Sequence, residues 1–258
     1  MIARTFAAAF LASALALTAV PAPAAAQENM TLSPKQVEAV KKVVRDYLME
    51  HPEVLGEALE ALREKMRAQA ESDALKMVEA RKDDIFSNPD DPVGGNLKGD
   101  IVVVEFFDYN CGFCKQTFDP VWEAVKADGK VKVVMKELPI LGPDSVVASR
   151  VALVAKAQSQ AKYDEVHRAF MKFRGRLDEK AIFRLAGEAG MNVEQLKKDM
   201  ASPDIDRQLK KASELARSLE IGATPTFIVG DRILSSALDQ PTLKQLIDNA
   251  RKAQAKKG

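Results

Sequence analysis

Two cysteines, Cys111 and Cys114, are the residues whose type and spacing most clearly indicate chemistry in this sequence. They follow the run IVVVEFF at 101–107, which predicts a strand covered on both faces, and they precede the apolar spacing of a helix. A thiol at a helix N-terminus is favoured as the thiolate, because unpaired N–H groups and the helix dipole point towards it. The second thiol can reach the first, so the pair predicts dithiol–disulfide exchange.

Zinc binding and a structural disulfide are the other interpretations of this pair. Zinc takes about four ligands, and besides the cysteines the sequence offers only His51 and His167, which are distant and on other predicted helices. A disulfide between such close cysteines closes a very short loop and stabilises little. Redox chemistry is therefore favoured over zinc or copper binding. We expect no metal, and no cofactor other than the redox-active Cys111–Cys114 disulfide.

Glu105 is an acid inside the apolar run that leads to Cys111. A carboxylate is costly to bury in its charged form, so we expect burial to raise the pKa of Glu105. A buried Glu105 could lie beneath the disulfide and pass protons to Cys114. The alternative is a glutamate at the strand edge that faces solvent, but the surrounding apolar residues favour the buried position.

The second informative motif is GATPTF at 222–227, where Pro225 precedes a predicted buried strand at 226–230. Proline has no N–H to donate to a sheet, so an ordinary peptide bond is unfavourable here. A cis peptide between Thr224 and Pro225 would turn the chain sharply and resolve the conflict. In redox folds such a loop faces the active sulfurs and pairs its backbone with an extended substrate. A trans proline at the start of a strand is the alternative.

Residues 1–26 have the pattern of a signal peptide, with Arg4 before an apolar run at 6–20 and three alanines at 24–26 as a cleavage site. An uncleaved membrane anchor is the alternative. We therefore expect a mature chain that begins at Gln27 in a secretory compartment.

The mature chain is expected to have almost no net charge and a single cysteine pair. Removal of Arg4 lowers the count of Lys and Arg from 38 to 37, against 37 Asp and Glu. This balance gives no electrostatic reason to expect nucleic-acid binding. A secreted protein of this length with one cysteine pair does not use disulfides to stabilise its fold.

Residues 27–90 predict a separate helical segment followed by a linker. Ser33 and Pro34 form a helix start, and the His51-Pro52 pair separates a first helix from a second. Each helix has one apolar stripe, with a coiled-coil spacing in the second. The stripe residues are Val37, Val40, Val44, Tyr47 and Leu48, then Leu55, Leu59, Leu62 and Met66. Self-association through residues 30–66 is favoured over a solvated helix, and turn-forming residues at 88–96 predict a linker with a short edge strand.

Residues 91–258 predict an α/β domain interrupted by helices. The strand at 101–107, a helix to about 127 and a strand at 131–138 form a βαβ unit with a parallel pair. Residues 144–219 show helical spacing throughout and predict a helical insertion. A hairpin at 226–234 and a helix at 240–253 complete the predicted domain.

Three segments together resemble the DsbA-like thiol:disulfide oxidoreductases, which have a thioredoxin fold. They are VVEFFDYNCGFCK at 103–115, KELPILGPDS at 136–145 and GATPTFIVG at 222–230. The stretch YLMEHPEVL at 47–55 resembles the N-terminal segment of the ScsC branch, the suppressor-of-copper-sensitivity proteins. The resemblance covers nearly all of the mature chain.

This resemblance implies roles for individual residues. Cys111 is then the attacking thiol, Cys114 the resolving thiol, Glu105 the buried acid and Pro225 the cis-proline. Substrate binding is expected at Thr224, Pro225, Gly112 and Phe113. ScsC-like members are periplasmic, and some form trimers through their N-terminal helices and isomerise disulfides.

The chain departs from the strongly oxidising members of this family, which carry histidine where Phe113 stands. Phe113 cannot donate a hydrogen bond to a thiolate, and Thr224 before the proline is more similar to isomerases. We therefore expect a periplasmic homotrimeric disulfide isomerase or reductase, kept reduced by a membrane-bound thiol reductase. Its substrates would be misfolded or cysteine-containing secreted proteins. A monomeric dithiol oxidase and a copper-binding tolerance protein are the alternatives.

Overall fold

The computed structural model describes residues 32–256 and divides the chain into two compact units, at residues 1–60 and 61–258. The helix α2 (Pro52–Ala80) contributes to both units. The predicted signal peptide at 1–26 and the predicted mature start at Gln27 lie outside the described residues. Within residues 32–256, no helix is long and apolar enough to cross a membrane.

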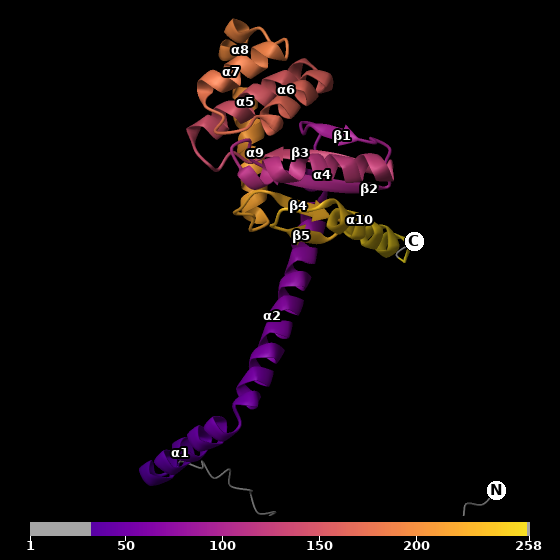
Figure 1. The fold of residues 1–258 in the computed structure, drawn as a ribbon. Helices are drawn as coiled ribbons and strands as arrows, with labels where there is room; N and C mark the ends of the chain where they lie inside the picture. The colour runs from indigo at the N-terminus through magenta and orange to yellow at the C-terminus, as the bar shows by residue number, and fades with distance from the viewer. Residues whose placement is uncertain (1–31, 257–258) are drawn as a thin grey trace, which may run out of the picture. The chain divides into compact units, whose positions relative to one another are not determined.

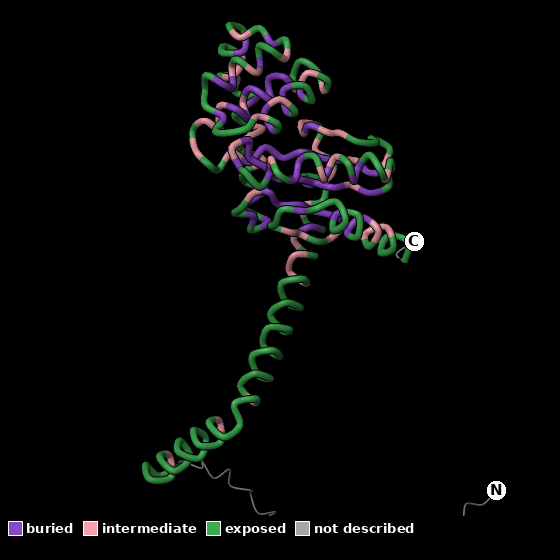
Figure 2. The backbone as a smooth tube through the Cα atoms, in the orientation of Figure 1, coloured by how far each residue is buried: buried purple, intermediate pink, exposed green. Residues whose placement is uncertain are grey.

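The first unit contains α1 (Pro34–Glu50) and the beginning of α2, as the sequence predicts (Figure 1). The Ser33 hydroxyl accepts from the N–H of Gln36, and the Gln36 side chain accepts from the N–H of Ser33, so the predicted helix start is a capping box. Helix α1 ends at Glu50, because the residue before a proline avoids the helical conformation. His51 lies between the two helices and not on one. No residue of α1 is buried (Figure 2).

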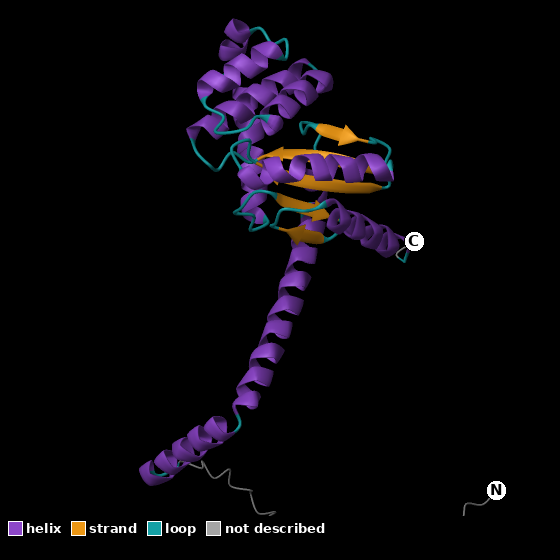
Figure 3. Ribbon diagram, in the orientation of Figure 1, coloured by secondary structure: helices purple, strands orange, loops and turns teal. Residues whose placement is uncertain are grey.

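The second unit is a five-stranded sheet with helices packed on both faces (Figure 3). After α2 the chain forms α3 (Lys82–Phe86), β1 (Val93–Gly95), β2 (Ile101–Phe107), α4 (Gly112–Asp128), β3 (Val131–Glu137), α5 (Pro143–Gln158), α6 (Gln160–Lys172), α7 (Glu179–Glu188), α8 (Val193–Asp199), α9 (Pro203–Ser218), β4 (Thr226–Val229), β5 (Arg232–Leu234) and α10 (Gln240–Ala255). The strand order is β1-β3-β2-β4-β5, with β2 parallel to β3 and antiparallel to β4. The parallel pair confirms the predicted βαβ unit.

The central strand β2 separates two apolar cores, because its alternate side chains point to opposite faces of the sheet. Val103 and Phe107 belong to the core that contains both cysteines and residues of α4 and α10. Val104 and Phe106 belong to the core on the other face, which α3, α9 and the end of α2 complete. Both faces of β2 are therefore covered, as its uninterrupted apolar run predicts (Figure 2).

The helical insertion is present as predicted and consists of α5 to α9 (Figure 3). Its inner residues are continuous with the cysteine-containing core, so the insertion packs onto the sheet domain instead of forming a core of its own. Helix α9 joins the two faces, since Ile205 packs in the first core and Leu215 and Leu219 belong to the second. The insertion thereby places α5 and α6 next to the segment that carries the cysteines.

Candidate active site

The two cysteines lie at the N-terminus of α4. Cys111 is the N-cap residue, and its Sγ accepts from the N–H of Cys114 at 3.4 Å. The Cys111 thiol also donates to the carbonyl oxygen of Thr224 at 3.2 Å. Both residues are free thiols here, with Cys111 5% exposed and Cys114 fully buried. Cys111 is therefore the more accessible of the two sulfurs.

The local contacts separate the pKa values of the two thiols. A hydrogen bond from the Cys114 thiol lowers the pKa of Cys111 to about 6, against the opposing effect of burial. The Thr224 side chain and the N–H groups of Cys114 and Phe113 lower this pKa further. Burial, the hydrogen bond to Cys111 and the charge of Glu105 all raise the pKa of Cys114 well above its usual range. At neutral pH the site therefore holds one thiolate and one thiol.

Glu105 is buried on the same face of the sheet as α4, which excludes the solvent-facing alternative. Its side chain is 3% exposed, and its Oε1 has no hydrogen-bond partner among the described residues. Burial, and secondarily the charge of Cys111, raise the pKa of Glu105 to about 8. Strand alternation places Glu105 with Val103 and Phe107, on the side of the cysteine-containing core.

The Thr224–Pro225 peptide bond is cis, as the sequence predicts. It directly precedes β4, where Thr226 pairs with Phe106 of β2. This pairing brings the Thr224 carbonyl to the Cys111 sulfur, although the two residues are far apart in sequence. Hydrogen bonds thus link Cys111 to Cys114 and to Thr224. Glu105 interacts with both cysteines through charge.

Exposed residues surround the buried thiols. Gly112 is exposed, and Phe113 exposes 62% of its surface between the two cysteines. Leu141 is also exposed, and its N–H donates to the buried Asp108 carboxylate at 2.9 Å. The other oxygen of Asp108 accepts from the N–H of Asn110 at 2.7 Å, so Asp108 joins the loop after β3 to the turn before Cys111. Apolar side chains are therefore presented to solvent close to the reactive sulfur.

Comparison with known proteins shows the family to which the chain belongs. Residues 102–248, more than half of the chain, match the model of the DSBA-like thioredoxin domain. The chain belongs to the DSBA-like thioredoxin family. Residues 36–69 of this DsbA-like chain also match the N-terminal domain of the copper resistance protein ScsC. The predicted family, its ScsC branch and its fold are confirmed, and the chain is a thiol:disulfide oxidoreductase.

Three relatives illustrate how far the similarity extends. The thiol:disulfide interchange protein DsbA of Bordetella parapertussis is 29% identical over 155 residues, which are 58% of this chain and 73% of that protein. A thioredoxin-like oxidoreductase from Silicibacter pomeroyi is 40% identical, with 66% of this chain and 98% of that one covered and a TM-score of 0.64. Proteus mirabilis ScsC in a transitional conformation is 28% identical over 86% of this chain and 100% of that one, with a TM-score of 0.63.

The DsbA-like domain also contains a buried polar cluster that sequence reasoning missed. Glu137, at the end of β3, accepts hydrogen bonds from three hydroxyl groups. Its Oε1 accepts from Tyr109 and Tyr163 at 3.0 Å each, and its Oε2 accepts from Ser149 at 2.8 Å. His167 Nδ1 lies 2.9 Å from the Tyr109 hydroxyl. Tyr109 lies in the turn before Cys111, so this cluster holds the active-site turn against α5 and α6.

Burial determines the charge state of this cluster. It raises the pKa of Glu137 to about 8, although the three hydroxyl donors oppose this rise. It also lowers the pKa of His167 to about 3, so His167 is neutral near pH 7. Strand alternation places Glu137 on the same face of β3 as Val131, Val133 and Met135, which belong to the cysteine-containing core, so its position in the strand was a signal for burial.

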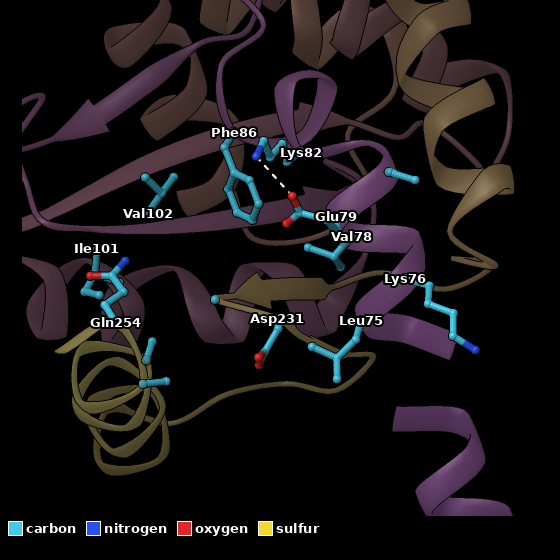
Figure 4. A pocket seen from close by; sticks show the side chains of 14 residues that line it. Leu75, Lys76, Val78, Glu79, Lys82, Phe86, Ile101, Val102, Asp231 and Gln254 are labelled. Carbon is cyan, nitrogen blue, oxygen red and sulfur yellow. Dashed lines mark hydrogen bonds and ion pairs between the residues drawn. The ribbon is translucent and has the colours of Figure 1, made fainter. Parts of the chain in front are cut away.

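A further cavity of about 820 Å³ lies away from the thiols of this DsbA-like chain (Figure 4). It is lined by Ile101 and Val102 at the beginning of β2, whereas Cys111 follows the end of that strand. Its other walls come from Leu75, Val78 and Phe86, and Lys82 pairs with Glu79 at 3.0 Å beside it. None of the predicted site residues lines this cavity.

Metal ligands are sparse near the thiols. Across residues 32–256, no group of three or more His, Cys, Asp or Glu side chains is arranged to hold a metal ion.

Proposed function

We propose that this oxidoreductase works from its dithiol form as a disulfide isomerase and reductase in the periplasm. The observation that carries the proposal is the arrangement of the two thiols, with Cys111 at the N-terminus of α4 as the more accessible sulfur and Cys114 fully buried. Cys111 is a thiolate at neutral pH and can attack at once, whereas Cys114 keeps its proton because it is buried. A mixed disulfide with Cys111 therefore persists until Cys114 loses that proton, which gives a substrate time to rearrange.

The exchange conserves bonds and electrons at each step. The Cys111 thiolate attacks one sulfur of a substrate disulfide, so a bond from Cys111 to the substrate forms and the substrate's other sulfur leaves as a thiolate. In isomerisation, a substrate thiolate then attacks the mixed disulfide, and Cys111 leaves again as the thiolate. In reduction, Cys114 loses its proton and attacks Cys111, the substrate leaves with two thiols, and the Cys111–Cys114 disulfide forms.

Glu105 is proposed to take the proton of Cys114 in the reductive branch. The charge of the Cys111 thiolate helps to keep Glu105 protonated in the dithiol form. That charge disappears when Cys111 enters a mixed disulfide, so the pKa of Glu105 falls and its carboxylate becomes available as a base. Proton removal from Cys114 is thereby linked to the arrival of a substrate.

Substrate recognition is assigned to the predicted residues around Cys111. The exposed Phe113 and Gly112 offer contact surface, and the backbone at Thr224–Pro225 can pair with an extended peptide. Exposed apolar surface suits misfolded or cysteine-containing secreted proteins, which expose their own apolar residues. The direction of the reaction requires a membrane-bound thiol reductase as the partner that keeps the dithiol form.

The N-terminal helices are proposed to assemble the protein as a homotrimer. Seven of the nine stripe residues are about half exposed or more on the single chain, which is unusual for apolar side chains in a series, and Val37 and Leu48 are partly buried. The exposed fractions are 49–51% for Val40, Val44 and Tyr47, and 49–64% for Leu55, Leu59, Leu62 and Met66. Several Cys111 sites around one space would favour a second attack on a bound substrate.

Copper binding is a second candidate, and the match of residues 36–69 to a copper resistance protein favours it. The two sulfurs could hold Cu(I), but this would leave Glu105 and the cis Thr224–Pro225 bond without a role. Copper titration of the reduced protein against a chelator distinguishes the two candidates. Stoichiometric, competitor-resistant binding without any thiol exchange would reverse their order.

The proposed chemistry is tested with two single variants and a substrate protein that contains scrambled disulfides. Cys114→Ser should accumulate a mixed disulfide with the substrate on non-reducing gels, because the resolving thiol is absent. Cys111→Ser should form none, because the remaining thiol is buried and protonated. Adducts with Cys111→Ser, or recovery of native disulfides at the same rate with both variants, would overturn the assignment.

A further inference from the structure

A cationic pocket of about 590 Å³ lies beside the turn that carries Cys111. One wall is Gly112 and Lys115 at the beginning of α4, and the opposite wall is the loop between α6 and α7, with Arg174 and Arg176. Asn110 and Gly112, the two sequence neighbours of Cys111, both line this pocket, so it lies next to the turn that carries the attacking thiol. The exchange chemistry proposed above uses none of the charged side chains of this pocket.

The loop between α6 and α7 is held firmly against the cysteine turn. The Asn110 side chain accepts from the N–H of Leu177 at 2.8 Å and donates to its carbonyl at 3.2 Å. Lys115 Nζ donates to the carbonyl oxygens of Phe173 and Gly175, at 3.0 Å each. The loop is thus attached to the turn and to α4 on both sides of Arg174, and the pocket is formed before any substrate arrives.

Positive charge is in excess in this pocket. Lys115, Arg174 and Arg176 line the pocket together with one acid, Asp144, to which Arg176 donates at 2.8 and 3.1 Å. The charge of the buried Asp108 also acts on Lys115. Arg174 makes no ion pair with any residue in the part of the chain that the structure describes. Among the residues that line the pocket, positive side chains therefore outnumber acidic ones. An exposed guanidinium such as that of Arg174 can form paired hydrogen bonds with a carboxylate.

We propose that the cationic pocket binds a carboxylate side chain near the reacting cysteine of the substrate, and so selects acidic segments. The proposal rests on the proposed function, in which Cys111 forms the mixed disulfide. A cavity of this volume is roughly 8 Å across, so about two or three extended residues, at about 3.3 Å each, span it. The carboxylate remains unchanged in the reaction and serves only to position the substrate sulfur.

The test uses the reduced full-length protein and peptide disulfides that differ at one position, two residues from the cysteine. With Glu at this position we expect exchange about fivefold faster than with Gln, and with Lys slower than with Gln. The preference should shrink at high salt, because exposed charges are screened. Arg174→Gln should reduce the preference for Glu, and the added substitution Arg176→Gln should abolish it.

Lys244→Gln on α10 is the matched control, because it removes the same charge from an exposed position on another element. It should keep the fivefold preference. Equal rates for the three peptides with the wild-type protein, or an equal loss of preference with Lys244→Gln, would overturn the pocket proposal.

The pocket and the proposed function can fail separately. Exchange of the wild-type protein with a neutral disulfide, bis(2-hydroxyethyl) disulfide, reports the thiol chemistry alone. If that exchange is absent, binding of the same peptides with serine in place of cysteine still tests the pocket by fluorescence anisotropy. Tighter binding of the Glu peptide that Arg174→Gln weakens supports the pocket, and equal binding of the Glu and Gln peptides refutes it.

Discussion

Both the N–H and the thiol of Cys114 donate to the Cys111 sulfur, yet the surroundings of the two cysteines give them opposite protonation states. Cys111 lies at the open N-terminus of α4 and is reached by two backbone N–H groups and by the Cys114 thiol. Cys114 is enclosed by the core, where a negative charge is costly. Phe113 lies between the two cysteines and offers the Cys111 sulfur a backbone N–H but no polar side chain. A polar side chain at position 113 would therefore change the pKa of Cys111.

Phe113→His should lower the pKa of Cys111 below about 6, because an imidazolium next to the sulfur stabilises the thiolate. A stabilised thiolate favours the reduced form, so each unit of pKa should raise the reduction potential by roughly 30 mV. Thiolate absorbance against pH and redox equilibration with glutathione measure the two effects. Phe113→Leu is the control and should change neither quantity, and a histidine variant that behaves like it would contradict the prediction.

Glu105→Gln should increase the free energy of unfolding of the reduced protein at pH 7 by about 2–3 kcal/mol. The carboxyl pKa rises from 4.5 in the unfolded chain to about 8 in the fold. Between these values the unfolded state loses its proton while the folded state keeps it, so wild-type stability falls as pH rises from 4.5 to 8. The free energy of unfolding of Glu105→Gln, measured by urea unfolding, should lack this contribution to its decrease between pH 4.5 and 8.

Glu123→Gln is the control for Glu105, because Glu123 is an exposed acid on α4. It should leave both the stability at pH 7 and its pH dependence within about 0.5 kcal/mol of the wild type. Should Glu105→Gln unfold more easily than the wild type at pH 7, the buried carboxyl group must be held by a partner, and its proposed role as a base would lose its support.

The end of β3 connects elements that otherwise meet only through apolar contacts. Glu137 accepts hydrogen bonds from hydroxyl groups of the cysteine turn, of α5 and of α6. It therefore positions the insertion relative to Cys111. Glu137→Ala should reduce the free energy of unfolding by about 3 kcal/mol or more, since three buried hydroxyl groups would lose their acceptor. Glu137→Gln keeps one carbonyl acceptor and should cost less. Equal losses for both variants in urea unfolding would show that the hydroxyl groups find other partners.

The apolar stripe of α1 and α2 predicts an assembled protein. Val44→Glu combined with Leu59→Glu should convert a trimer to single chains, because it places charge in the middle of the proposed interface. Lys35→Glu, at an exposed position off the stripe, is the control and should leave the mass unchanged. Light scattering gives the mass directly. A wild-type protein with the mass of one chain would remove the oligomer and weaken the isomerase proposal.

At the scale of the whole molecule, the sequence predicted the elements and the reactive residues but not the buried polar contacts. Apolar periodicity and turn residues place β2, α4 and β3 correctly, since these features depend on neighbours in the sequence. Cys111 and Pro225 were found because few structures accommodate these residue types in such positions. Lys136 and Glu137 were missed, although both are buried.

Lys136 and Glu137 were missed because their partners are distant in sequence. Lys136 pairs with Asp91 in the segment before β1 and donates to the Asp84 carbonyl in α3, on one face of the sheet. Glu137 accepts hydrogen bonds from hydroxyl groups on the other face of the sheet. Only the tertiary arrangement shows that α3 and α9 cover one side of β3, whereas α4, α5 and α6 cover the other. Strand β3 therefore buries one charged residue on each of its faces.

The redox state of the Cys111–Cys114 pair inside the cell tests the central claim most directly. Rapid acid quenching, followed by alkylation with a thiol reagent that adds mass, separates the dithiol from the disulfide on a gel. A protein that isomerises and reduces disulfides must be kept as the dithiol, so both cysteines should be alkylated. A pair found mainly as the disulfide would contradict the account and identify the protein as an oxidase.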